Sequence, residues 1–178
     1  MLFQKKVYNN TKPTFEINEK KLDQEYKKLQ KCFHPDKYHS KSDKMLKFSE
    51  TYSMYINEAY KALKDDLQRS EYLLNLLTHG KKDELLETIK DDEYFLKEVM
   101  EIRFEIEDCN NKDELDQHEQ YVNQLKKETI NKINQLLDQQ DYQNAAIHII
   151  KLRYHESTLE NIKKIFEQIQ NNKFQQQF

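Results

Sequence analysis

Hydrophobic residues recur every three or four positions along most of this chain, which is the spacing of one face of an α-helix. In the first such stretch, residues 19–33, the apolar positions are Leu22, Tyr26, Leu29 and Phe33. The opposite face of the same stretch carries Lys27, Lys28 and Lys31. Asn18 is placed to cap this helix, and Pro35 disfavours helical geometry in the residue before it. The pattern therefore predicts a helix over about residues 19–33.

Two further amphipathic segments complete the amino-terminal half. Residues 37–44 are polar and predict a loop. The next apolar stripe consists of Met45, Phe48, Tyr52, Ile56, Ala59 and Leu63. It predicts a helix of the right length to lie antiparallel to the first. A third segment, residues 67–77, ends near the only glycine, Gly80, which suits a helix terminus and marks a domain boundary.

Three longer periodic segments follow, over residues 91–109, 113–138 and 141–171. Their connections, residues 110–112 and 139–140, are short enough to make neighbouring helices antiparallel. We expect a domain over residues 1–78, a three-helix bundle over 79–173, and a Gln-rich tail over 174–178 to which no function is assigned.

Composition supports an all-α fold, because 178 residues contain 1 Gly and 2 Pro, too few for the turns and bulges of β-rich folds. The same scarcity excludes Gly-rich phosphate-binding loops, so we expect no bound nucleotide. No segment approaches the ~18 apolar residues of a membrane-spanning helix. Two cysteines, Cys32 and Cys109, cannot supply the ligands of an iron–sulfur cluster or structural zinc, so no cofactor is expected.

Charge is distributed unevenly. Residues 1–80 carry 15 Lys and Arg against 11 Asp and Glu, a net charge of +4, while residues 81–178 carry 14 against 21, a net charge of −7. Such asymmetry suggests two surfaces with different partners, or random drift in a Lys- and Asn-rich composition. Nucleic acid is an unsuitable partner, since acidic residues are interleaved with the basic ones throughout.

The tripeptide His34-Pro35-Asp36 lies between a helix with a basic face and a second amphipathic helix. This arrangement resembles the J-domain of Hsp70 co-chaperones, whose basic helix is matched by Tyr26, Lys27 and Lys28. Pro35 stiffens the turn, Asp36 offers a carboxylate to an arginine fork, and the lysines attract an acidic surface.

The similarity extends to the HscB family, also called Hsc20 or Jac1, the J-proteins of iron–sulfur cluster biogenesis. One motif, R-[AS]-E-Y-L-L, is matched by the run from Arg69 to Leu74. A second, F-L-x-x-x-[LM]-E-x-R, is matched by Phe95, Leu96, Met100, Glu101 and Arg103. The third includes K-L-R-[FY] and is matched by the run from Lys151 to Tyr154. The resemblance as a whole covers about residues 15–166.

This resemblance implies a J-type co-chaperone, not an enzyme. Its bundle would bind a cluster-assembly scaffold of the IscU or Isu type, and its J-domain would deliver that scaffold to a mitochondrial-type Hsp70 (HscA- or Ssq1-like) while stimulating ATP hydrolysis. The implied Hsp70-binding residues are Tyr26, Lys27, Lys28, Lys31, His34, Pro35 and Asp36. The implied scaffold-binding residues are Phe95, Leu96, Met100, Glu101 and Tyr154, of which Phe95 is the weaker member.

The chain departs from the family pattern at several positions. Lys97 stands where the family often has Met, and Phe104 where bacterial members have Glu. Asp66 replaces a usual Pro, so we expect the third helix to run on continuously. Residues 1–14 match the family's first helix poorly.

Alternatives accompany each interpretation. The lysines could be a solvated face, and Leu96, Met100 and Tyr154 could be bundle core. Cys32, His34 and His39 match no standard zinc spacing. A competing function is a J-like module that serves as a structural subunit of a larger mitochondrial assembly. Residues 1–15 contain three lysines and no acid before Glu16, which fits a mitochondrial presequence weakly, so a matrix location rests on the family resemblance.

Overall fold

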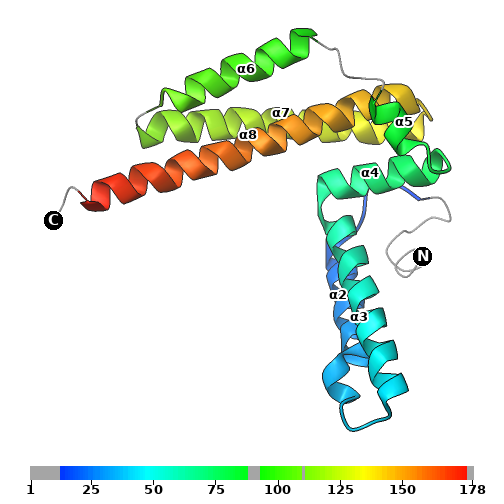
Figure 1. The fold of residues 1–178 in the computed structure, drawn as a ribbon. Helices are drawn as coiled ribbons and strands as arrows, with labels where there is room; N and C mark the ends of the chain where they lie inside the picture. Colours follow the sequence, from blue (N-terminus) through cyan, green and yellow to red (C-terminus); the bar gives the residue numbers. More distant parts are fainter. Residues whose placement is uncertain (1–12, 88–92, 110, 176–178) are drawn as a thin grey trace. The chain divides into compact units, whose positions relative to one another are not determined.

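A computed structural model describes residues 13–87, 93–109 and 111–175. Within these ranges every regular element is helical and no strand occurs, so the predicted all-α class is confirmed (Figure 1). The described residues divide into two compact units that separate between His79 and Gly80. The prediction about residues 1–14 falls almost entirely outside the described part.

The first unit is built on an antiparallel helical hairpin. Helix α2 (Glu19–Phe33) is followed by the 3₁₀ helix η1 (Pro35–Lys37) and by α3 (Asp43–Lys64). The bounds predicted for the first helix are confirmed, as is its cap: the Lys21 amide donates to Asn18 Oδ1 over 3.0 Å. Leu22, Ile56 and Leu63 form the buried core of the hairpin.

A polar seam runs beside that core and fixes the register of the two helices. Gln30 Nε2 donates to Asn57 Oδ1 over 2.6 Å, and its Oε1 accepts from Ser53 Oγ over 3.1 Å. Tyr26 also donates to Asn57 Oδ1, over 2.9 Å, and its ring stacks on Tyr60 with 4.0 Å between centroids. Burial costs a polar group less free energy when it is hydrogen-bonded than when it is unpaired. The register of α2 on α3 that pairs these groups is therefore favoured.

The predicted stripe of α3 is only partly buried. Ile56 and Leu63 lie in the core, whereas Met45 is 48% exposed and Phe48 52% exposed. The reason is length: α2 has 15 residues and α3 has 22, so at 1.5 Å per residue they span about 22 Å and about 33 Å. The first turns of α3 therefore extend beyond the end of α2.

The expectation that the third helix would continue from the second without a break is wrong. Asp65 has extended backbone (φ −88°, ψ 127°), and α4 (Asp66–Leu77) begins after it. Asp65 caps α4, because its Oδ1 accepts from the Gln68 amide over 2.7 Å. Buried Arg69 then ties the two helices together by donating to the Leu63 carbonyl over 2.7 Å and by pairing with Asp66. A carboxylate cap at Asp65 thus separates the two helices.

The end of α4 follows the prediction for Gly80. Thr78 is the C-cap residue, and His79 (φ 55°) and Gly80 (φ 92°) follow it with left-handed backbone. Glycine adopts this conformation without the steric cost that a side chain brings, so the glycine stands where the chain leaves the helix.

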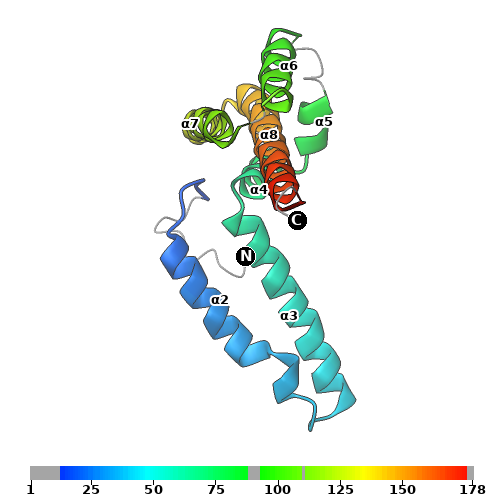
Figure 2. The same cartoon turned by 90° about the vertical axis from the view of Figure 1, so that its left-hand side faces the viewer.

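The second unit is built around its last helix. It contains α5 (Lys82–Glu87), which the sequence pattern did not predict, α6 (Glu93–Glu107), α7 (Lys112–Asp138) and α8 (Tyr142–Gln175). Figure 2 shows α8 in the centre, with α7 on one side and α5 and α6 on others. The α7–α8 pair carries most of the core, including Val122, Ile133, Ile149 and Leu152. Helix α8 continues beyond the predicted end at residue 171, and residues 176–178 of the predicted tail lie outside the described residues.

Candidate functional site: a loop in one unit and a groove in the other

The His-Pro-Asp loop is exposed and compact. Pro35 opens η1, and His34 caps it, with His34 Nδ1 3.4 Å from the Asp36 amide and 3.4 Å from Asp36 Oδ2. On its other side Asp36 Oδ1 lies 3.8 Å from His39 Nε2. The Asp36 side chain is 77% exposed, so its carboxylate is presented to solvent between two imidazoles.

Three groups of this segment anchor it to the end of α2. The last carbonyls of a helix have no partner within the helix and need one from outside. Here the His34 amide donates to the Gln30 carbonyl, Lys37 Nζ donates to the Lys31 carbonyl, and Tyr38 Oη donates to the Cys32 carbonyl. The loop is therefore held in one orientation by backbone acceptors, and Asp36 needs no bond to the hairpin.

The basic face predicted for α2 is exposed, but Tyr26 does not belong to it. Lys27, Lys28 and Lys31 are all exposed, and Lys28 pairs with Glu25 over 2.7 Å. Tyr26 is half-buried and packs against α3, since it lies on the apolar stripe of α2 and not among the lysines. Tyr26 thus helps to hold the hairpin together, and its role in Hsp70 binding stays a prediction.

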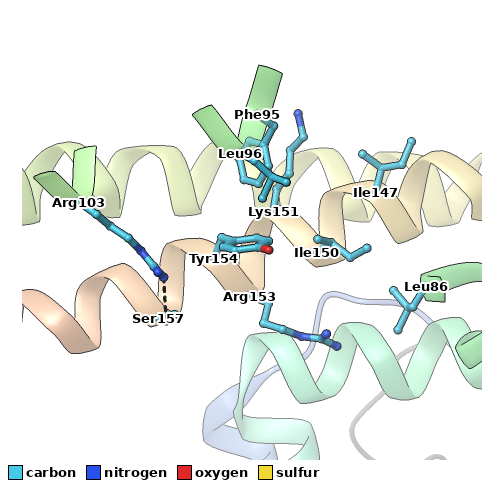
Figure 3. A pocket seen from close by; sticks show the side chains of 10 residues that line it. All are labelled: Leu86, Phe95, Leu96, Arg103, Ile147, Ile150, Lys151, Arg153, Tyr154 and Ser157. Carbon is cyan, nitrogen blue, oxygen red and sulfur yellow. Dashed lines mark hydrogen bonds between the residues drawn. The ribbon is translucent and has the colours of Figure 1, made fainter. Parts of the chain in front are cut away.

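In the second unit a groove of about 480 Å³ opens between α5, α6 and α8 (Figure 3). We call it the α8 groove. The residues that line it are Leu86, Phe95, Leu96, Arg103, Ile147, Ile150, Lys151, Arg153, Tyr154 and Ser157. The structure thus brings together Phe95, Leu96 and Tyr154, three of the five residues predicted to bind a scaffold.

Phe95 is a wall of this groove and not an exposed anchor. It is 6% exposed, and its ring meets Tyr154 edge-on with 5.6 Å between centroids and His155 at 6.1 Å. Lys151 Nζ covers the ring at 4.7 Å. Phe95 is buried because it belongs to the stripe Phe95, Val99, Ile102 and Ile106, which faces α8.

Met100 and Glu101 lie outside the lining of the groove. Both are exposed, Met100 at 55%, one helical turn beyond Leu96 on α6. Glu101 Oε1 lies 3.9 Å from Lys97 Nζ, so the residue that departs from the family pattern partly screens its charge. These two side chains extend the apolar lining of the groove onto an open helix face.

The groove has a polar end that the predicted site residues did not include. Arg103 Nη2 donates to Ser157 Oγ over 3.0 Å and links α6 to α8, as the dashed line in Figure 3 shows. Ile147 and Ile150 were also missed, although the steps from Ile147 to Ile150 and Tyr154 are three and four residues. That second stripe of α8, beside the one that faces α7, is the signal that could have found the groove.

His155 lies behind the groove wall and is nearly buried, with 7% of its surface exposed. Burial, helped by the positive charge of Lys151, lowers the pKa of His155 from 6.5 to about 4. The imidazole is neutral at pH 7 and serves as packing for Phe95. Cys109 is likewise buried, and burial raises the pKa of its thiol above the ordinary value, so it stays protonated.

Other site chemistries were sought across the described ranges. In them no three His, Cys, Asp or Glu side chains converge as metal ligands would. None of the described helices combines the length and the apolar character needed to cross a bilayer.

The two units define a class of protein: all-α chains that join a His-Pro-Asp helical hairpin to a separate helical bundle. Residues 91–163 match the family model described as the HSCB C-terminal oligomerisation domain. The chain is 31% identical to the "Co-chaperone protein HscB homolog" of Photobacterium profundum, over 86% of this chain and 91% of that protein. The chain therefore belongs to the HscB family.

Animal relatives and solved structures agree with this assignment. The "Iron-sulfur cluster co-chaperone protein HscB" of Mus musculus is 33% identical over 86% of this chain, but the chain spans 65% of the mouse protein and 63% of the human one. Chaperone HscB from Vibrio cholerae superposes with a TM-score of 0.76 at 28% identity, covering 88% of this chain and 93% of that one. Human HscB gives 0.76 at 29% identity, covering 88% and 83%.

Proposed function

We propose that this protein is a J-type co-chaperone of iron–sulfur cluster biogenesis. In this proposal the α8 groove binds an IscU- or Isu-type scaffold, and the His-Pro-Asp loop engages a dedicated Hsp70 and stimulates its ATP hydrolysis. The observation that carries the proposal is the separation of an anchored, exposed loop in one unit from an apolar groove in the other, in a chain of the HscB family.

The loop suits a partner that carries an arginine. An exposed carboxylate held by backbone anchors accepts two parallel hydrogen bonds from a guanidinium without first being freed from an intramolecular ion pair of comparable strength. His34 and His39 approach Asp36 at 3.4 and 3.8 Å, which are long contacts. Lys27 and Lys31 would draw an acidic surface towards the same end of the hairpin.

The groove suits a partner that inserts apolar side chains. Leu96 on α6 and Tyr154 on α8 are both half-buried and line the same groove. A side chain bound in the groove would contact both residues and complete their burial. Aromatic anchors at the centre of a polar-rimmed patch are the residues that dominate interface energies. Phe95 acts through Tyr154, whose ring it supports, while Met100 and Glu101 extend the contact along α6.

No catalytic chemistry is assigned to this chain. ATP hydrolysis belongs to the Hsp70, and the iron–sulfur cluster is cargo of the scaffold. The co-chaperone supplies proximity: it holds the scaffold and the Hsp70 on one chain and so raises the effective concentration of one at the other. The same proposal places the protein in the mitochondrial matrix; the chain has mouse and human relatives, and the family also has bacterial members.

Two matched variants test the two-site design. Asp36→Asn removes the carboxylate charge and should abolish stimulation of the Hsp70 while leaving scaffold affinity within twofold of wild type. Tyr154→Ala should weaken scaffold binding by tenfold or more, a typical loss at an interface anchor, and leave scaffold-free stimulation intact. Equal losses in both assays for both variants would contradict a design with two independent sites.

A further inference from the structure

The first turns of α3 carry an apolar stripe that the fold leaves uncovered. Met45, Phe48, Tyr52 and Tyr55 follow one another at steps of three, four and three residues, so they share one helix face. Met45, Phe48 and Tyr55 are 48%, 52% and 51% exposed, and Tyr52 is half-buried. Sequence periodicity alone predicts burial for the first part of this stripe, because its spacing is that of a core face.

The stripe is continuous with the His-Pro-Asp loop. The Phe48 and Tyr52 rings lie 4.2 Å apart between centroids, and Tyr52 stacks on Phe33 at 5.4 Å. Phe33 is the last residue of α2 and directly precedes His34. The rings of Phe48, Tyr52 and Phe33 therefore form a continuous row that leads from the first turns of α3 to the residue before the loop. We call these three residues the aromatic row.

Exposed residues of both charges surround the aromatic row, and they include Asp43 and Glu50 on α3. Lys44 and Lys47 are exposed on the same first turns of α3, and Lys41 is exposed in the preceding loop. An apolar centre with a charged border is the usual composition of a docking surface, and an exposed apolar patch of this kind on a soluble domain marks an interaction site. The matching surface has apolar side chains at its centre and charged groups at its border.

We propose that the aromatic row is the apolar part of the Hsp70 docking surface, with Phe48 as its main anchor. This inference rests on the proposed function, since the occupant is the partner surface that receives Asp36. The loop and the lysines steer and orient that partner, and Phe48 and Tyr52 supply the contact area that retains it. Truncating Phe48 should therefore raise the dissociation rate, whereas charge changes on α2 should lower the association rate.

The test compares Phe48→Ala with Met54→Ala in single-turnover ATP hydrolysis by the Hsp70, titrated with co-chaperone. Met54 is 49% exposed on the same helix but falls outside the stripe's steps of three and four residues, so it is a matched control. We expect Phe48→Ala to raise the half-maximal concentration by about tenfold, the loss of a typical anchor, and Met54→Ala to stay within twofold. Phe48→Leu, which keeps an apolar side chain, should recover most of the loss.

Each of the other possible outcomes overturns this inference, and one of them also overturns the proposed function. If wild type stimulates through Asp36 but Phe48→Ala equals Met54→Ala, the inference fails and the proposed function stands. If wild type fails to stimulate at all, the proposed function fails and this inference with it. Sedimentation of the chain alone gives a further check: self-association that Phe48→Ala abolishes would assign the row to a second copy of the chain and overturn the proposal.

Discussion

Low pH should destabilise the second unit through protonation of one residue, His155. Its pKa is lowered to about 4 in the folded chain, against 6.5 for an ordinary histidine. A proton therefore binds the unfolded state more tightly than the folded state, so stability is full above pH 6.5 and declines as pH falls from 6.5 towards 4. The wall of the α8 groove depends on this side chain, because its ring packs against Phe95.

The size of the effect follows from the two pKa values. At pH 5 about 97% of unfolded and about 10% of folded molecules carry the proton, which corresponds to a loss of about 2 kcal/mol. The loss approaches about 3 kcal/mol once pH reaches the folded pKa. Glu98 and Glu128 border the same small cavity and place further charged groups near the ring. A variant without the imidazole is therefore needed to isolate its share.

His155→Phe keeps a ring against Phe95 and removes the titrating group. Because the chain divides into two compact units, urea unfolding should be followed by hydrogen exchange in peptides from α7 and α8, at pH 7.5 and pH 5. The wild-type loss of stability between these pH values should exceed that of His155→Phe by about 2 kcal/mol. An NMR titration of the folded chain that gave His155 a pKa near 6.5 would contradict this prediction. So would a loss of stability in His155→Phe as large as the loss in wild type.

Three further predictions concern stability and binding. Arg69→Ala should destabilise the first unit by about 3 kcal/mol in chemical denaturation, because it removes the buried guanidinium that donates to the Leu63 carbonyl and pairs with Asp66. A loss of stability below about 1 kcal/mol would argue against this role of Arg69. Lys27→Glu with Lys31→Glu should slow association with the Hsp70 in stopped-flow measurements and flatten its salt dependence, whereas an unchanged salt slope would remove these lysines from the docking surface. Ser157→Ala should weaken scaffold binding less than Tyr154→Ala in calorimetry, since the serine only orients Arg103; the reverse order would move the centre of the site to the polar end.

Local signals in the sequence predict the hairpin well. Asn18, the stripe from Leu22 to Phe33 and Pro35 determine where α2 begins and ends, and each acts within one or two turns of the residue concerned. The break between α3 and α4 was missed because an aspartate such as Asp65 can cap a new helix as well as continue an existing one. Burial of Phe48 was overestimated because it depends on how far α2 reaches, which periodicity does not report.

The groove was predicted in part for a similar reason. Helix α6 has two apolar stripes, one through Phe95 and Val99 and one through Leu96 and Met100. Periodicity identifies both but does not determine which one packs against α8. The structure buries Phe95 and Val99 and leaves Met100 exposed, so Leu96 lies at the border between core and groove. Helix α5, with six residues, is too short for its periodicity to stand out.

In the proposed function, one chain couples a scaffold to an Hsp70 through the His-Pro-Asp loop. The most direct test is single-turnover ATP hydrolysis by a mitochondrial-type Hsp70, measured with the purified protein, with and without an IscU-type scaffold, for wild type and His34→Gln. We expect stimulation by wild type that grows when scaffold is added and disappears in His34→Gln. Absence of stimulation under conditions in which an established J-protein is active, or stimulation that persists without His34, would contradict the proposed function.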